Sequence, residues 1–244
     1  LPAGDTRNRF GKRIEELSGL KLGTDFHLGY SPERVYSNRI IQDLKTYPKI
    51  VSGDNEKGLE LVSNFYKDAL NCDLLPVSSL ETAEFTKVAE SVYRDVNIAL
   101  VNELAIYADT LGINITEVIH AANSEPYSNL HWPGIGVGGH CIPVYPYFFI
   151  KKGLQDGLVT LSREINDSMV NYAVSLIENH FHSLENRNIL ILGLSFRENV
   201  KEVTKSSTLL LIDELKKKGV DVYVDDPQFS DQEIASFNVK PFKE

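Results

Sequence analysis

The sequence predicts an α/β protein in which a purely helical segment separates two stretches of alternating strands and helices. Short apolar runs alternate with helical patterns over residues 1–77 and again over 185–244. This alternation is typical of βαβ units on parallel sheets. Between them, a helical pattern runs from Ser79 to Leu111 without Gly or Pro. We therefore expect three domains or parts of domains, over 1–77, 78–184 and 185–244.

The first stretch shows both patterns clearly. Phe10, Ile14 and Leu17 recur at helical spacing, and Asp54 is a candidate N-cap before a second apolar helix pattern. The expected elements are helices over 6–18 and 54–70 and strands over 26–30, 49–53 and 72–77.

The middle stretch is dominated by the helix expected over 79–111, roughly 45–50 Å long at ~1.5 Å per residue. A helix of that length commonly bridges domains or forms a subunit interface. A shorter helix over 114–122, with Asn114 as N-cap, and a helix over 161–181 are also expected. Residues 126–146 are rich in Pro and Gly, which predicts loops.

The last stretch predicts one βαβ unit. Its elements are a buried strand over 188–193, an amphipathic helix over 206–218 and a strand over 220–224. One such unit cannot close a sheet of its own, so we expect this domain to be incomplete. The chain begins at Leu1 and its single Met is Met169, so we also expect a preceding segment to be missing.

Composition excludes several classes of protein. The 244 residues carry a net charge of −9, which disfavours nonspecific binding to nucleic acid. No run of ~18–20 apolar residues predicts a membrane span, and no signal peptide is recognisable. Cys72 and Cys141 form neither a disulfide framework nor a zinc-site spacing. We expect a cytoplasmic protein without a metal site.

The run Gly134–Gly139 matches the G-x-G-x-x-G pattern of dinucleotide-binding folds. That fingerprint must follow a strand and open a helix, whereas this run lies between prolines in a predicted loop, so we reject the reading. The remaining alternatives are a flexible surface loop and a loop whose backbone approaches a ligand closely.

Cys141 directly follows this loop and His140. A lone cysteine is most often a small packing residue, and that reading holds for Cys72 in its apolar run. For Cys141 the glycine-rich approach also supports a nucleophilic thiol.

Lys87 shares a helix face with Glu84, Glu90, Ser91 and Arg94. On spacing alone, a solvated face with salt bridges is favoured. The functional alternative is a cation directed at an oxyanion or carboxylate in a cleft.

Glu33 follows the end of a predicted strand. Ligands of α/β proteins bind at such ends, although an ordinary surface carboxylate is favoured without other information.

Five blocks of sequence, in one order, resemble the UDP-glucose/GDP-mannose dehydrogenase family, nearest to its UDP-N-acetylmannosamine and UDP-N-acetylglucosamine 6-dehydrogenases. The resemblance covers essentially the whole chain. Its blocks are Gly29–Arg34, Ala83–Lys87, Tyr93–Glu103, Pro133–Pro143 and Leu190–Asn199, the last followed by Val224–Pro227.

The resemblance implies the end of a Rossmann-type NAD domain, a central all-helical domain and the start of a second Rossmann-like domain that binds UDP-sugar. It implies NAD-dependent oxidation of a UDP-sugar C6 alcohol to the uronate, supplying a precursor of surface polysaccharide. It also implies a homodimer formed through the 79–111 helix.

By the same resemblance, Cys141 is the nucleophile that forms a thiohemiacetal and then a thioester, Glu33 is the general base and Lys87 stabilises oxyanion charge. The implied NAD contacts are Glu33, Cys141 and Thr204. The implied substrate contacts are Arg34, Ser91, Leu130, Pro133, Gly134, Gly136, Gly138, Phe196 and Arg197.

Four positions depart from the family pattern. Ser91 replaces a usual Asn, Tyr145 a usual Asp, and Tyr127 and Thr204 each a usual Arg. The substitutions at Ser91, Tyr145 and Thr204 motivate an alternative, a catalytically impaired paralogue that binds UDP-sugar or a partner subunit. A further alternative is a thiol enzyme that uses Cys141 without NAD.

Overall fold

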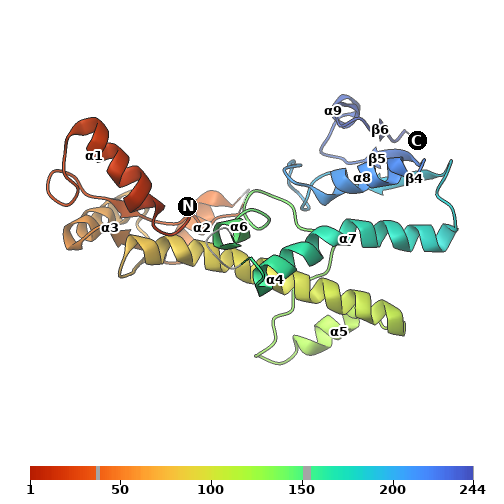
Figure 1. Ribbon diagram of the computed structural model, residues 1–244, viewed down its shortest axis with the longest axis horizontal. Coiled ribbons are helices and arrows are strands. Elements are labelled where there is room, and N and C mark those ends of the chain that lie inside the picture. The colour runs from red at the N-terminus through yellow and green to blue at the C-terminus, as the bar shows by residue number, and fades with distance from the viewer. Residues whose placement is uncertain (37–38, 151–154, 244) are drawn as a thin grey trace. The chain divides into compact units, whose positions relative to one another are not determined.

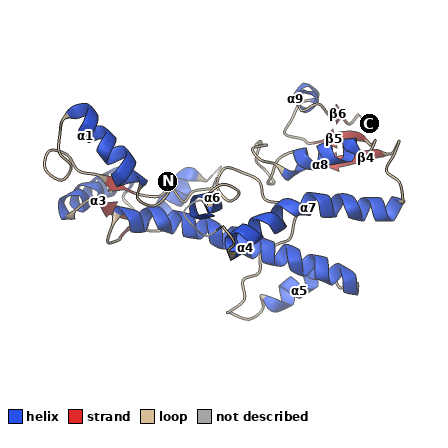
Figure 2. Cartoon of the chain, in the orientation of Figure 1, coloured by secondary structure: helices blue, strands red, loops and turns tan. Residues whose placement is uncertain are grey.

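The computed structural model describes residues 1–36, 39–150 and 155–243, which form two compact units, Leu1–Ser91 and Val92–Glu244. Helix α4 (Leu80–Leu111) belongs to both and has 32 residues, which confirms the long helix expected from the sequence. Figure 1 labels the elements and Figure 2 separates helices from strands.

The N-terminal unit contains a three-stranded sheet in the order β1-β2-β3, with β2 parallel to β3. The helix pattern over 6–18 is confirmed, although its first turns are a π-helix. The elements that precede α4 are η1 (Thr6–Gly11), α1 (Lys12–Ser18), β1 (Gly29–Tyr30), α2 (Ile40–Thr46), β2 (Lys49–Gly53), α3 (Glu56–Leu70) and β3 (Leu74–Pro76).

Strand β1 differs from expectation, because it is only two residues long and runs antiparallel to β2. The cause lies just before it. Leu28 N donates to Asp54 Oδ1 at 2.9 Å, and Asp54 N donates to Leu28 O at 2.9 Å. These bonds fix the entry of β1 beside the exit of β2, so the two strands run in opposite directions.

The same bonds explain why Asp54 is not the N-cap of α3. With Asp54 engaged by Leu28, the cap moves one residue along to Asn55, whose side chain accepts from Gly58 N at 2.9 Å. Asn is an equally good cap, so the helix itself begins as expected.

The C-terminal unit holds a second three-stranded sheet, entirely parallel, in the order β4-β5-β6. Asn114 caps its helix as predicted, by accepting from Thr116 N at 3.0 Å. The elements after α4 are α5 (Ile115–Ala122), α6 (Pro146–Ile150), α7 (Leu158–Phe181), β4 (Asn188–Leu192), α8 (Ser207–Lys217), β5 (Asp221–Asp225), α9 (Asp231–Ser236) and β6 (Lys240–Pro241).

One apolar core joins α7 and α8 to the sheet, through side chains such as Val174, Ile212, Leu215 and Val224. The predicted βαβ unit is therefore confirmed. Strand β4, however, is not buried as expected. Its Leu190 and Leu192 are 42% and 76% exposed, because they lie on the face of the sheet opposite the core, whereas Ile189 and Ile191 pack against the core.

Helices α4 and α7 are joined by a hydrogen bond from Tyr172 Oη to Asp109 Oδ2 at 2.5 Å, and this bond raises the pKa of Tyr172 to about 12. The neutral phenol donates the bond. Its stabilising contribution is thus fully present below the ordinary tyrosine pKa of about 10 and is lost as pH rises through about 12. Ultraviolet absorbance titration should show a tyrosine that ionises near pH 12, and this phase should vanish in Tyr172→Phe.

The control is Tyr107→Phe, since Tyr107 is 63% exposed on α4. That variant should retain the phase near pH 12. Persistence of the phase in Tyr172→Phe would show that another tyrosine produces it.

Candidate functional site

The part of the α4 face that carries Lys87 is buried, which corrects the solvated face favoured by spacing alone for Glu84, Lys87 and Ser91, whereas Glu90 is partly exposed and forms a salt bridge with Arg34. Glu84, Ser91, Asp95 and Asn102 are fully buried, and Lys87 is only 9% exposed. A buried polar group is costly without a partner, so each of these side chains is expected to hold another segment of the chain.

Glu84 shows the effect most simply, because it holds the start of the chain. Its carboxylate accepts from Gly4 N at 2.5 Å, Thr6 N at 2.7 Å and Thr6 Oγ1 at 2.5 Å. Backbone N–H groups at the start of a helix are well suited to an anion. Ser91, in contrast, donates to its own helix at Lys87 O, 3.1 Å away.

Arg34 fixes the segment after β1 on the N-terminal half of α4. Its guanidinium lies 3.2 Å from Glu90 Oε1, and it also donates to Pro48 O and covers the ring of Tyr47. The structure thus brings the predicted residue Arg34 to Glu90, on the turn of α4 between Lys87 and Ser91.

Glu33 is paired with Lys49, a residue that the sequence analysis missed. Lys49 Nζ lies 3.0 Å from Glu33 Oε2 and 5.2 Å from the ring centre of Tyr66. The Lys49 side chain is only 7% exposed, whereas that of Glu33 is 56% exposed. Glu33 is therefore more than a surface carboxylate, because it neutralises a buried cation.

In the C-terminal unit, the glycine run Gly134–Gly139 packs against residues that follow β4. A Cβ on Gly136 would lie 2.4 Å from Ser207 Oγ, and a Cβ on Gly138 would lie 2.3 Å from Phe196 Cβ. Since neither distance is tolerable, only glycine allows the loop to lie so close.

The loop is also held by backbone bonding, because Gly139 N donates to Thr204 O at 2.8 Å. The alternative of a flexible surface loop is therefore wrong. The run follows no strand and opens no helix, which confirms the rejection of a dinucleotide fingerprint. The structure brings together the predicted residues Gly136, Gly138, Phe196 and Thr204.

Asparagine side chains hold the segment that leads into the loop. Asn97 Nδ2 donates to Asn129 O at 2.8 Å and Asn97 Oδ1 accepts from His131 N at 2.9 Å. Asn123 makes two similar bonds to the backbone of Leu130. Sequence reasoning missed both asparagines, although Asn97 lies within the block 93–103 that carried the resemblance.

Cys141 lies at the end of the glycine run, as a half-buried free thiol. Its carbonyl accepts from Tyr145 N at 2.9 Å, so both residues lie in one turn. The ring of Tyr145 stacks on Phe148, with centroids 5.4 Å apart. The neighbouring His140 pairs through Nε2 with Glu202.

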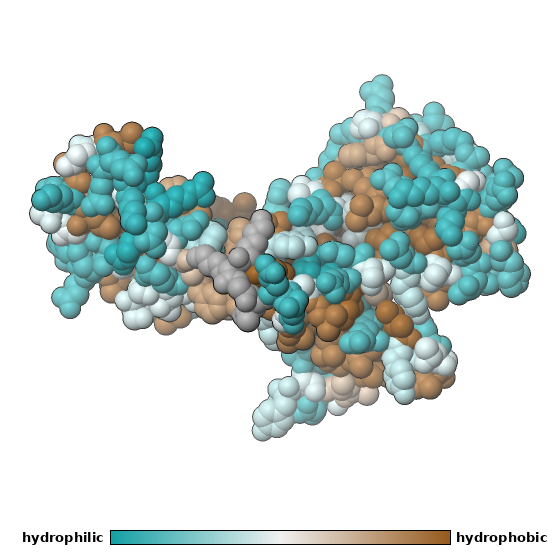
Figure 3. All heavy atoms as spheres, in the orientation of Figure 1, coloured by the Kyte–Doolittle hydropathy of each residue, from teal (hydrophilic) through white to brown (hydrophobic). Residues whose placement is uncertain are grey.

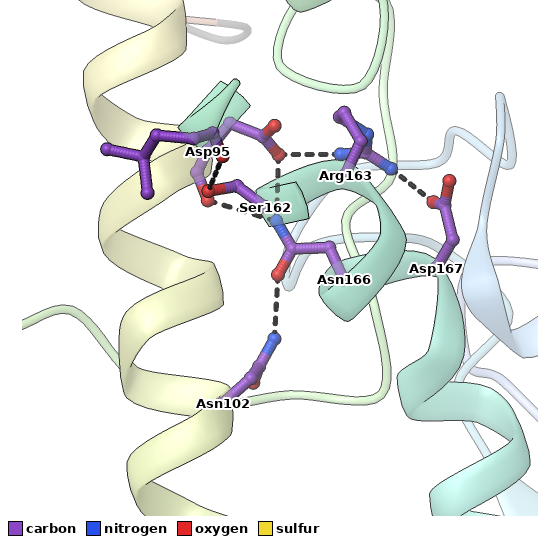
Figure 4. Close-up of polar contacts among 7 residues, drawn as sticks. Asp95, Asn102, Ser162, Arg163, Asn166 and Asp167 are labelled. Carbon is purple, nitrogen blue, oxygen red and sulfur yellow. Dashed lines mark hydrogen bonds and ion pairs between the residues drawn. The ribbon is translucent and has the colours of Figure 1, made fainter. Parts of the chain in front are cut away.

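Farther along α4, the buried side chains of Asp95 and Asn102 form a polar network with α7 (Figure 4). Arg163 Nη1 lies 2.6 Å from Asp95 Oδ1, and Asn166 Nδ2 donates to Asp95 Oδ1 at 2.8 Å. Burial raises the pKa of Asp95, and the adjacent guanidinium opposes that rise. Burial acts to lower the pKa of Arg163, but the carboxylates of Asp95 and Asp167 raise it overall.

Comparison with known proteins decides the family. Residues 81–168 match the central domain of the UDP-glucose/GDP-mannose dehydrogenase family, and residues 190–243 match the UDP binding domain of the same family. The chain belongs to this family. Both the resemblance and the expected fold class are thereby confirmed.

Individual relatives support the same assignment. UDP-N-acetyl-D-mannosamine dehydrogenase of Pyrococcus horikoshii is 34% identical over 93% of this chain and 55% of that protein. UDP-N-acetyl-D-glucosamine 6-dehydrogenase of Pseudomonas aeruginosa is 34% identical over 89% of this chain and 53% of that protein. The solved UDP-D-ManNAc dehydrogenase from P. horikoshii matches with a TM-score of 0.86 at 33% identity, over 92% of this chain and 55% of that one.

The chain therefore spans about half the length of the curated relatives it matches. Of the residues that the resemblance implies for the site, the N-terminal unit contains Glu33, Arg34, Lys87 and Ser91. Cys141 and the glycine loop fall in the C-terminal unit. No helix of the described residues is long and apolar enough to cross a membrane, and these residues contain no cluster of His, Cys, Asp or Glu suited to a metal ion.

The pairing of Glu33 with Lys49 predicts an asymmetric effect on stability. Glu33→Ala leaves a buried ammonium without its partner and should lower the free energy of unfolding by about 1–2 kcal/mol. Lys49→Met leaves only a half-exposed carboxylate and places an apolar chain over Tyr66, so it should cost less than about 1 kcal/mol. Urea denaturation followed by circular dichroism measures both values.

Glu60→Ala is the matched control. Glu60 pairs with Lys57, and both side chains are 58% exposed, so its loss should cost under about 0.5 kcal/mol. If Glu33→Ala lowers the free energy of unfolding no more than this control does, then pairing with Glu33 does not stabilise the buried ammonium of Lys49.

Proposed function

We propose that the protein carrying this chain oxidises the C6 alcohol of a UDP-sugar, in particular a UDP-N-acetylhexosamine, to the uronate with NAD. The product serves as a precursor of surface polysaccharide. The observation that supports this most is the glycine loop, which is clamped against Phe196 and Thr204 and ends at the free thiol of Cys141.

The first oxidation gives an aldehyde at C6. The thiolate of Cys141 then attacks the aldehyde carbon, and a new C–S bond forms as the carbonyl oxygen becomes the alkoxide of a thiohemiacetal. Loss of a second hydride gives a thioester. Water attacks its carbonyl carbon, the C–S bond breaks, and the thiolate is regenerated with release of the carboxylate.

Lys87 and Glu33 have complementary roles in this scheme. Lys87 is the cation that stabilises the alkoxide and the oxyanion, and its burial strengthens that interaction by excluding water. Glu33 removes a proton from the attacking water, and its half-exposed carboxylate is accessible for that purpose. The UDP-sugar is bound by the residues that the resemblance implies for it, namely Arg34, Ser91, Leu130, Pro133, Gly134, Gly136, Gly138, Phe196 and Arg197.

Each oxidation would deliver one hydride to one NAD, so two NAD would be consumed for each sugar oxidised. The described residues do not by themselves fit the pyrophosphate of this cofactor, because no glycine-rich turn among them joins a strand to a helix. In this chain, Glu33, Cys141 and Thr204 would contact the cofactor. A cytoplasmic location is consistent with two free cysteines.

The substitution at Tyr145 supports a second candidate, a paralogue that binds UDP-sugar or a partner subunit without turnover. By resemblance, the usual residue of the family there is Asp, whereas here a neutral ring stacks on Phe148. A stacked ring offers no carboxylate to orient water or Lys87.

Turnover distinguishes the two candidates. The complete gene product, supplied with NAD and UDP-N-acetylmannosamine or UDP-N-acetylglucosamine, should yield two NADH per sugar. Cys141→Ala should lower the rate by at least about 1,000-fold. Cys72→Ala is the matched control and should stay within about twofold of wild type. If no NADH forms although UDP-sugar still binds, the paralogue is favoured. Recovery of NADH formation in Tyr145→Asp would then show that Tyr145 causes the loss of turnover.

A homodimer through α4 is part of the proposal. Leu100, Tyr107 and Leu111 lie on one stripe of this helix and are 47%, 63% and 54% exposed. Figure 3 shows apolar side chains interrupting the polar surface of the C-terminal unit. The exposed stripe of Leu100, Tyr107 and Leu111 is suited to packing against the same stripe of a second copy.

Sedimentation analysis tests the dimer. Tyr107→Glu introduces a charge into the stripe and should shift the protein to monomer at micromolar concentration. Leu210→Glu, at a 57% exposed position of α8, should leave the dimer intact. A wild-type monomer, or an unaffected Tyr107→Glu dimer, would contradict the assignment of α4 as the interface.

A further inference from the structure

The polar network between α4 and α7 extends to the glycine loop through Asn102. Asn102 Oδ1 accepts from Gly134 N at 2.9 Å, and Asn102 Nδ2 donates to Asn166 Oδ1 at 2.9 Å. The Asn102 side chain is fully buried on α4. Both ends of its amide are therefore in use, one on the loop and one on α7.

Asn166 is fixed in turn by Asp95. Its Nδ2 donates to Asp95 O at 3.0 Å and to Asp95 Oδ1 at 2.8 Å, while Asp95 is paired with Arg163 (Figure 4). Asn166 is fully buried, and its oxygen faces a donor only because its nitrogen faces Asp95. The ion pair thus determines which way both amides point.

The direction of these amides decides whether Gly134 has a partner. If Asn102 were reversed, its NH₂ group would face the Gly134 N–H, and two donors would oppose each other. Asn166 prevents that reversal by requiring a donor from Asn102. A chain of oriented hydrogen bonds therefore runs from the Asp95–Arg163 pair to the first glycine of the loop.

The other contacts of the loop lie farther along. Gly136 lies close to the Asn166 carbonyl and Ser207, and Gly139 is held by Thr204 O. Within the glycine run, the bond from Gly134 is thus the one that ties the loop to α4, directly after the segment that Asn97 holds through His131. Loss of the bond between Gly134 N and Asn102 Oδ1 would shift the loop from its position against Phe196.

We propose that Asn102 is a positioning residue for UDP-sugar binding, oriented by Asn166 and the Asp95–Arg163 pair. It holds Gly134 so that the loop presents its backbone to the substrate and leads to Cys141. This inference rests on the proposed function for the identity of the ligand. The placement of the loop by Asn102 is independent of turnover.

The test compares wild type with Asn102→Ala in the complete gene product. Hydrogen exchange of the Gly134 amide, resolved within the segment 130–141, should be at least about tenfold faster in the variant, because this amide loses its acceptor. The KM for UDP-N-acetylmannosamine, and the Kd for UDP measured by calorimetry, should rise about 10- to 100-fold. The KM for NAD should stay within about twofold of wild type. A general loosening of the fold would instead raise the KM for NAD together with that for the UDP-sugar.

Tyr172→Phe is the matched control, since it removes another α4–α7 hydrogen bond that does not involve the loop. It should leave loop exchange and UDP affinity as in wild type. If Asn102→Ala fails to fold, Asn102→Asp replaces it. Asp keeps an acceptor for Gly134 N but loses the donor to Asn166, so UDP affinity should still fall while loop exchange rises less than tenfold.

The outcomes separate the two proposals. Equal loop exchange and equal UDP affinity in wild type and the folded Asn102 variant would overturn the positioning role. A wild-type protein that forms no NADH but binds UDP would overturn the proposed oxidation alone, and the comparison of UDP affinities would still decide the role of Asn102.

Discussion

The structure depends on the polar face that α4 buries. A long helix in a small protein commonly presents an apolar stripe to its neighbours. Here Glu84, Lys87, Asp95 and Asn102 are buried together with apolar residues such as Val88 and Val101. Because an unpaired polar group in the interior costs more than its hydrogen bond returns, these side chains specify their partners far more narrowly than leucines would. The start of the chain, helix α7 and the glycine loop are each placed by one of these groups.

Much of the fold was predictable because it depends on local signals. The absence of Gly and Pro over 79–111 predicted α4, the apolar run at 188–192 predicted β4, and Asn114 predicted a helix start. The glycine run was recognisable as a loop without the context of a dinucleotide site. Short elements such as α2, α6, α9 and β6 escaped notice because five to seven helical residues, or two in a strand, carry no measurable period.

The features that sequence reasoning missed depend on partners that are distant in the chain. The direction of β1 is set by Asp54, which is 26 residues beyond Leu28. The importance of Lys49 emerges only when it lies against Glu33, and that of Asn102 only when Gly134 and Asn166 are beside it. Spacing could show that Lys87 and its neighbours share a helix face, but not whether that face meets water or protein. The sequence resemblance named the loop and the thiol, whereas the supporting amides had to come from the structure.

The continuity of α4 has a consequence for how the protein can vary over evolution. Successive residues of an α-helix are turned by about 100° around its axis, so an insertion or deletion of one residue between Asp95 and Asn102 would rotate Asn102 by that angle relative to Asp95. Asp95 would keep its place against Asn166, but Asn102 would point away from both Asn166 and Gly134 even with every residue type unchanged. Substitutions on the outer side of α4 are therefore compatible with the fold, whereas a change in the number of residues between these two positions is not.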